Sequence, residues 1–93
     1  MLGKYVVIRT YSAGVHIGVL QSQSGKEVTL TDARRIWSWR GAFTLSEVSQ
    51  KGVSDESRLS MPVPAITLTE AIEIIPCSEA AEANLRSLET YEP

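Results

Sequence analysis

Cationic and aromatic side chains concentrate in one short stretch of the chain, residues 33–41. This stretch holds both tryptophans, Trp37 and Trp39, together with Arg34, Arg35 and Arg40. Guanidinium groups bind phosphate and carboxylate oxygens through paired hydrogen bonds, and indole rings stack on bases or cover apolar ligands. The stretch therefore predicts a binding surface. A plain structural role stays open, because tryptophans that alternate along a strand are often core residues and neighbouring arginines are often solvated.

Glu70 is the second residue with chemical potential. It interrupts the apolar face of a strand predicted over Ile66–Ile75. A carboxylate on such a face is costly unless it is paired, and Arg9, Arg34 and Arg35 are available partners. Glu70 is therefore either half of an ion pair that fixes strand register or an acceptor for ligand amines or hydroxyls.

A turn predicted at residues 11–14 adds backbone groups. Gly14 can take positive φ, and successive N–H groups beside Ser12 can cradle an anion. The candidate ligand-binding residues are Arg9, Ser12, Gly14, Arg34, Arg35, Trp37, Trp39, Arg40 and Glu70.

The sequence carries no catalytic or metal-binding signature. His16 and Cys77, the only histidine and the only cysteine, are far apart in the chain and are expected to be a surface or half-buried strand histidine and a small buried thiol. There is no nucleophile elbow, phosphate loop or dinucleotide fingerprint. We therefore expect a non-enzymatic protein without metal or cofactor.

Composition indicates one small globular domain spanning residues 1–93, with 43% apolar and 22% charged residues. A chain this short buries a modest core, which oligomerisation would enlarge, so a homo-oligomer is expected. The single cysteine fits a reducing compartment, and no apolar run is long enough for a membrane span or a signal peptide. A cytoplasmic protein without membrane association is the prediction.

The net charge of −2 conceals an asymmetry. Residues 1–51 carry seven cationic and three acidic side chains, whereas residues 52–93 carry two and eight. The basic half can face an acidic half or another anion. Avid binding to duplex nucleic acid is not expected of a chain with this overall balance.

Alternation of apolar residues predicts three antiparallel strands over 4–10, 15–21 and 26–31, joined by turns at 11–14 and 21–25. The first strand is apolar on both faces, which is typical of a central strand. Gly18 within the second strand predicts a bulge or a close neighbour. The third strand is expected to continue through the Arg/Trp stretch after a bulge or corner at Asp32–Ala33, with both indoles on one face.

Capping patterns predict two short helices. Thr44 and Glu47 form a capping box, Phe43 is expected to pack on Val48, and Gly52 suits the helix end. The second helix is capped by Ser78, with Ala81, Leu85 and Leu88 facing inward. Residues 52–60 are expected to be a surface loop. The fold class predicted is α+β, with a small antiparallel curved sheet or partly open β-barrel of four to five strands and two short helices.

Three blocks of the sequence, residues 5–15, 27–42 and 67–76, resemble a family of small phage-encoded proteins of uncharacterised function. The resemblance runs from about Lys4 to about Ala83. It implies a phage or prophage gene whose product acts in the cytoplasm of an infected host cell, and it implies no particular chemistry.

Three functions remain as hypotheses. The first is a ligand-binding protein, such as a counter-defence sponge that sequesters a nucleotide or another phosphorylated signal; this is an analogy of type and not of sequence. The alternative is a protein-interaction module that binds a host or phage protein through the Arg/Trp surface. Single-stranded nucleic-acid binding comes third, because the net acidity opposes it.

Overall fold

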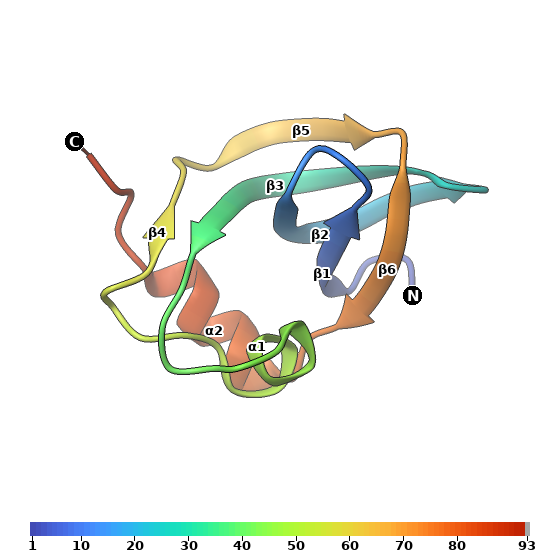
Figure 1. The fold of residues 1–93 in the computed structure, drawn as a ribbon. Coiled ribbons are helices and arrows are strands. Elements are labelled where there is room, and N and C mark those ends of the chain that lie inside the picture. The colour runs from blue at the N-terminus through green and yellow to red at the C-terminus, as the bar shows by residue number, and fades with distance from the viewer. Residues whose placement is uncertain (93) are drawn as a thin grey trace.

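The computed structural model describes residues 1–92, which form six strands and two helices (Figure 1). In chain order these are β1 (Tyr5–Thr10), β2 (Val15–Ser24), β3 (Glu27–Ser38), α1 (Leu45–Lys51), β4 (Arg58–Leu59), β5 (Val63–Leu68), β6 (Ala71–Pro76) and α2 (Glu79–Ser87). The predicted α+β class with a curved antiparallel sheet is confirmed.

The sheet has the strand order β4-β3-β2-β1-β6, and every pairing in it is antiparallel. β5 pairs with the first half of β3, on residues 28–33, while β4 pairs with the end of β3. β5 and β6 therefore lie at opposite edges of the sheet although only Thr69 and Glu70 separate them in sequence. This short connection requires the sheet to curl strongly, yet the sheet does not close.

The bend in β3 falls where the sequence predicted it. Asp32 has a positive φ of 51°, and the β2–β3 register shifts between Ile17 and Val19. Gly18 lies in this shift, and a Cβ atom there would come within 2.9 Å of the Thr31 carbonyl oxygen. Both the corner at Asp32 and the close approach at Gly18 are thereby confirmed.

Two apolar clusters make up the core, and β1 contributes to both. Tyr5 and Val7 pack with Ile17, Ile36, Val48, Val53, Leu59 and Leu85, in a cluster between the sheet and the helices. Val6 and Ile8 pack with Leu20, Val28, Leu30, Ala33, Leu68 and Ala71, inside the curl of the sheet. The prediction that β1 is buried on both faces is confirmed.

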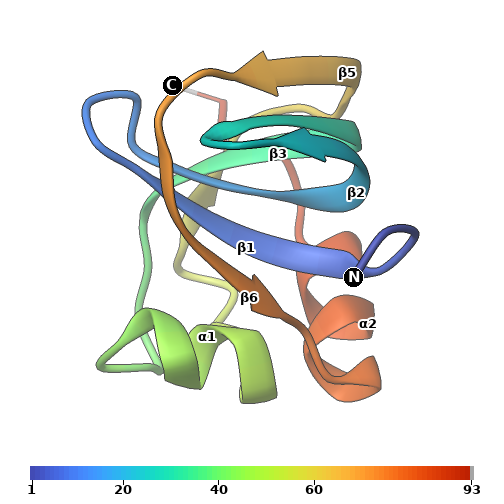
Figure 2. The same cartoon turned by 90° about the vertical axis from the view of Figure 1, so that its right-hand side faces the viewer.

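The helices lie together against one end of the sheet (Figure 2). Ala81 and Leu85 of α2 are fully buried and Leu88 packs beside them, as predicted. Asn84 of α2 ties the segment after α1 in place, since its side chain accepts from the Val53 N–H at 2.8 Å and donates to the Val53 carbonyl at 3.0 Å. A side chain at Gly52 would collide with Asn84.

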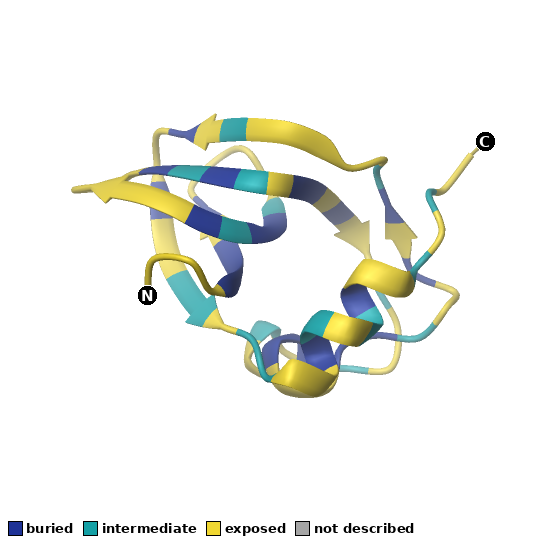
Figure 3. Ribbon diagram, turned by 180° about the vertical axis from the view of Figure 1, so that it is seen from behind, coloured by how far each residue is buried: buried dark blue, intermediate teal, exposed yellow. Residues whose placement is uncertain are grey.

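Three details of the predicted strands and loops are wrong. β2 continues to Ser24, so the second turn is confined to Gly25 and Lys26. The strand expected over Ile66–Ile75 breaks at Thr69–Glu70 into β5 and β6, and β4 adds a short strand, so there are six strands rather than four or five among residues 1–92. Residues 52–60 are not wholly at the surface, because Val53, Ser57 and Leu59 are buried. Predictions about single side chains that are wrong, including those for the tryptophans, are described with the candidate site below. β5 is largely exposed along its length (Figure 3).

Candidate functional site

An open groove of about 590 Å³ lies between the β1–β2 turn and the start of α1. We call it the aromatic groove. Its lining comprises Arg9, Thr10, Tyr11, Ser12, Gly14, Val15, Trp39, Phe43, Thr44, Leu45, Ser46, Glu73 and Ile75. These residues come from four separate segments of the chain, within residues 9–15, 39, 43–46 and 73–75, so the groove exists only in the folded protein.

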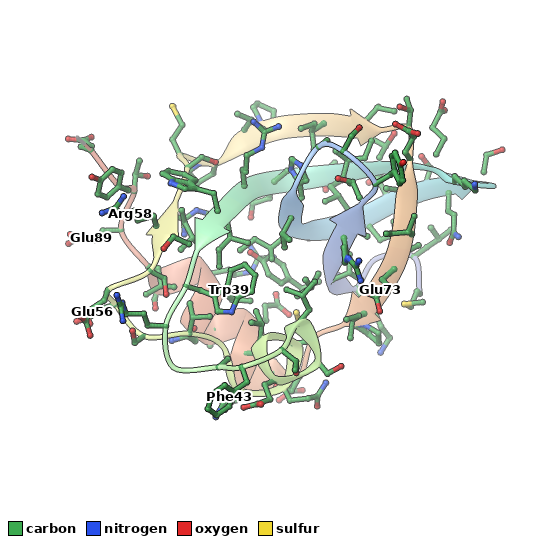
Figure 4. All side chains as sticks on the ribbon, viewed as in Figure 1. Trp39, Phe43, Glu56, Arg58, Glu73 and Glu89 are labelled. Atoms are coloured by element: carbon green, nitrogen blue, oxygen red, sulfur yellow. The ribbon has the colours of Figure 1, made fainter. Side chains whose placement is uncertain are left out.

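Three aromatic side chains define the groove. Trp39 is half-buried and packs against the core cluster under the helices. Tyr11 on the β1–β2 turn and Phe43 before α1 are 77% and 94% exposed. Figure 4 shows Trp39 directed toward the interior and Phe43 projecting away from the fold. Exposed aromatic side chains beside a hollow are typical of binding surfaces in small proteins.

The charges in the groove form a balanced pair. Arg9 and Glu73 are opposite each other on β1 and β6, and the Arg9 Nη1 atom donates to the Glu73 Oε1 atom at 3.3 Å. Both side chains are about half exposed to solvent, so the pair contributes little to stability and can exchange partners. A ligand bound here meets one cation and one anion, and not a cationic pocket.

The turn that carries Tyr11 and Ser12 is rigidly built. Gly14 has a φ of +83°, as predicted, and its carbonyl accepts from the Thr10 hydroxyl at 2.7 Å. The Thr10 hydroxyl oxygen in turn accepts from the Ala13 N–H at 2.8 Å. Because these bonds close the turn on itself, the Ala13 N–H is not available to cradle an anion.

The start of α1 makes the opposite wall. Thr44 caps the helix, and its hydroxyl accepts from the Glu47 N–H at 3.2 Å, as predicted. Glu47 pairs with Lys51 at 3.0 Å. The predicted packing of Phe43 on Val48 is wrong, because Phe43 is almost fully exposed while Val48 is buried in the core.

The two indoles do not share a face, so that prediction is wrong. Ile36 and Trp39 both contact the cluster under the helices, whereas Trp37 lies 47% exposed on the other side of β3. β3 ends at Ser38, and the alternation of side chains ends with it. Trp39 therefore lines the groove while Trp37 contacts Tyr91 of the C-terminal segment.

Arg34 has a structural position. Its side chain is 4% exposed, its Nε–H donates to the Ser60 carbonyl at 2.9 Å, and its Nη1 group donates to the Leu85 carbonyl at 2.9 Å. Burial lowers the pKa of this guanidinium below its usual value. Arg34 thus connects β3 to the last turn of α2, where a cation is favourable.

Arg35 and Arg40 also lie outside the groove. Arg35 is exposed and, with Arg34 and His16, borders a smaller hollow of about 160 Å³. Arg40 is exposed and follows β3. Its backbone N–H donates to the Ser57 hydroxyl at 3.1 Å. The predicted convergence of three arginines with two tryptophans is therefore absent from the fold of residues 1–92.

Glu70 lies at the corner between β5 and β6 and is exposed. Its carboxylate accepts from the Ser12 hydroxyl at 3.3 Å, and its carbonyl accepts from the Tyr11 N–H at 2.9 Å. Within the described part of the chain it pairs with none of Arg9, Arg34 or Arg35. The expected place on an apolar strand face is wrong, because the strand breaks at this residue.

The environments of His16 and Cys77 oppose chemical reactivity. The prediction of a surface or half-buried His16 is wrong, because the residue is fully buried and its Nε2–H donates to the Ala13 carbonyl at 2.9 Å. Burial lowers the pKa of His16, with a smaller contribution from Arg35. Burial also raises the pKa of the Cys77 thiol to about 11, so this thiol is protonated at neutral pH.

Two kinds of feature are absent from residues 1–92, a cluster of metal ligands and a membrane-spanning helix. No three His, Cys, Asp or Glu side chains come together as metal ligands. No helix in the same part of the chain is long and apolar enough to cross a membrane.

Four of the nine candidate residues predicted from the sequence line the groove, namely Arg9, Ser12, Gly14 and Trp39. The prediction missed Tyr11, Phe43 and Glu73. An aromatic residue inside a predicted turn was a usable signal for Tyr11. Nothing in the sequence distinguishes an exposed Phe43 from one packed on its helix, and Glu73 depends on strand pairing across the sheet.

The fold and groove define a small α+β domain with an open, curved antiparallel sheet and a surface groove lined by aromatic residues. The chain belongs to a family described as a domain of unknown function, DUF6948, whose family model matches residues 3–85. No curated protein and no solved structure matches the chain.

Proposed function

We propose that this chain is a non-enzymatic protein-interaction module that binds a segment of another protein in the aromatic groove. The observation that carries the proposal is the high exposure of Tyr11 and Phe43, which line the same hollow as the half-buried Trp39. Exposed aromatic side chains gain the most when a partner covers them, and aromatic residues dominate the binding energy of protein interfaces.

The charges in the groove favour a protein ligand over a phosphorylated one. Arg9 and Glu73 neutralise each other, and Glu70 adds a carboxylate beside Ser12. A multiply charged phosphate meets the Glu73 carboxylate in the groove and the Glu70 carboxylate next to it, whereas a peptide can pair with both signs of charge at the rim. The groove is open at the surface, which suits an extended segment.

A selection of random 12-residue peptides on the immobilised chain tests this proposal. Enriched peptides are expected to carry apolar or aromatic residues and to bind the Phe43→Ser and Tyr11→Ser variants at least tenfold more weakly. The matched control is Met61→Ser, since Met61 is an exposed apolar residue outside the groove. Equal affinity for the Phe43→Ser and Met61→Ser variants contradicts the proposal.

A second candidate is the sequestering of a nucleotide or another phosphorylated signal. It is supported by the meeting of Arg9, Ser12, Gly14 and Trp39 in one groove, with a guanidinium for phosphate and an indole for a base. With this candidate we also propose that the chain is encoded by a phage, acts in the cytoplasm of the infected host cell and assembles as a homo-oligomer.

Native mass spectrometry with a pool of cyclic and linear nucleotides separates the two candidates. A sponge retains a defined nucleotide mass per subunit, and the spectrum also counts the subunits. Glu73→Gln is expected to strengthen nucleotide retention because it frees Arg9 from its partner, while Arg9→Ala abolishes it. A chain that retains no nucleotide in either the wild-type or the Glu73→Gln form rules out sequestering of the nucleotides in that pool.

A further inference from the structure

The C-terminal segment after α2, residues 88–92, lies along the short strand β4. The N–H of Tyr91 donates to the Leu59 carbonyl at 2.9 Å, so the segment pairs with β4 through its backbone. Leu88 at the end of α2 already has extended backbone angles, with φ −71° and ψ 137°. The chain thus returns from α2 to the edge of the sheet (Figure 1).

The ring of Tyr91 is held by two side chains of neighbouring strands. Trp37 of β3 meets it edge to face, with ring centroids 5.8 Å apart and an interplanar angle of 82°. The Arg58 guanidinium of β4 lies 4.7 Å from the Tyr91 ring centroid. We call Trp37, Arg58 and the Leu59 carbonyl the tyrosine clamp. Edge-to-face stacking and cation–π contact are both selective for an aromatic ring.

The tail is held loosely in this clamp. Trp37 remains 47% exposed with Tyr91 in place, so the ring covers only part of the indole. The acidic neighbours Glu89 and Glu92 form no ion pair within residues 1–92. The clamp lies inside the region that the family model matches, residues 3–85, whereas Tyr91 lies beyond it. The domain therefore supplies the clamp, and a separate segment fills it.

We propose that the tyrosine clamp is a second peptide-binding site, independent of the aromatic groove, for an extended acidic segment of a partner protein that carries a tyrosine. The chain's own residues 89–92, Glu-Thr-Tyr-Glu, show this chemistry and occupy the site as a competing ligand. The partner's ring stacks on Trp37 and Arg58, its backbone pairs with β4, and its carboxylates lie near the Arg58 cation. A tail tethered by a few residues has an effective concentration in the millimolar range, so it excludes weak ligands and admits strong ones.

The test uses the full chain with Tyr91→Ala, which empties the clamp, and a peptide with the sequence of residues 87–92 as the probe. In an NMR titration this variant is expected to bind the peptide at least tenfold more tightly than the wild-type chain, with a shift of the Trp37 indole N–H resonance. A peptide with alanine in place of the tyrosine is the matched control and is expected not to bind. Trp37→Ala added to Tyr91→Ala should abolish binding.

Two results would overturn the proposal. One is a folded Tyr91→Ala chain that does not bind the peptide or that binds both peptides alike. The other comes from the wild-type chain. A saturating excess of the peptide should displace the tail and move the Tyr91 amide resonance toward its random-coil chemical shift. A Tyr91 amide resonance that does not move shows that the peptide does not compete with the tail for the clamp. A wild-type dimer that the peptide dissociates would assign the clamp to the tail of a second copy instead.

Discussion

Trp37 and Trp39 are two residues apart, yet they belong to different surfaces of the molecule. Trp39 lies between the core cluster under the helices and the aromatic groove. Trp37 lies on the outer side of β3, where Tyr91 of the tail covers part of it. The difference arises because β3 ends at Ser38, so that the rule of alternating faces applies to Trp37 and not to Trp39.

The two surfaces also differ in how they are held. The groove is built from the β1–β2 turn, the start of α1 and β6, and the half-buried Trp39 indole in it packs against the core. The tyrosine clamp is built from the short edge strand β4 and the end of β3, and the Tyr91 ring that it holds comes from the C-terminal segment. The groove is thus a permanent feature of the fold, while the filling of the clamp depends on a few reversible contacts.

The largest expected effect is a difference in unfolding free energy between the variants of the two tryptophans. Trp39→Ala removes an indole from the core boundary and should lower the free energy of unfolding by about 2–3 kcal/mol, less than the 3–5 kcal/mol typical of fully buried tryptophans. Trp37→Ala, at the exposed site, should cost about 1 kcal/mol or less. Urea denaturation measures both. Equal losses for the two variants would mean that the indoles are equally embedded.

The arginines of the same stretch give the next largest effect. Arg34→Met removes the donors to the Ser60 carbonyl and the buried Leu85 carbonyl and should cost about 2 kcal/mol. Arg40→Met is the matched control, because the Arg40 side chain is exposed, and it should change stability by less than about 0.5 kcal/mol. Denaturation curves test both variants. A neutral Arg34→Met would show that this guanidinium is free for a ligand after all.

The fold was largely predictable because its strands carry regular local signals. Alternating apolar residues identify β1 and β2, and the caps Thr44 and Ser78 locate both helices. The break at Thr69–Glu70 was not predictable from local pattern, because the residues on either side are equally apolar and β-prone. Only the pairing of β5 with β3 and of β6 with β1 places a corner there.

The candidate site was less predictable, because it depends on long-range packing. Residue types drew attention to the Arg/Trp stretch, but of its arginines and tryptophans only Trp39 lines the groove, and the burial of Arg34 depends on carbonyls at residues 60 and 85. The Arg9–Glu73 pair depends on the register of β1 with β6. Residues that are neighbours in sequence therefore lie in different places, with Arg34 in the core, Trp39 in the groove and Trp37 in the clamp.

Acidification should weaken the protein through His16, whose Nε2–H donates to the Ala13 carbonyl in the turn that lines the groove. Burial lowers the pKa of His16 in the folded state below its unfolded value of about 6.5. The unfolded chain therefore binds more protons below that pH. Stability is full above it and falls on acidification, with a slope of at most about 1.4 kcal/mol per pH unit.

Denaturation at pH 7.5, 6.5 and 5.5 measures this dependence, and NMR gives the pKa of His16 directly. His16 is the only histidine in the sequence, so His16→Gln is a clean control that should flatten the profile over this range. An unchanged slope in that variant would assign the dependence to carboxylates instead.

The smallest effect tests the contact between Trp37 and Tyr91 through a double-mutant cycle with Trp37→Ala, Tyr91→Ala and the combined variant. Because the rings meet edge to face at the surface, we expect a coupling of about 0.5–1 kcal/mol in unfolding free energy. Once either ring is absent, removal of the other should cost little. Additive losses would mean that Tyr91 is held by Arg58 and the Leu59 carbonyl alone, and the distinction between the two tryptophans would then rest on burial and not on a partner ring.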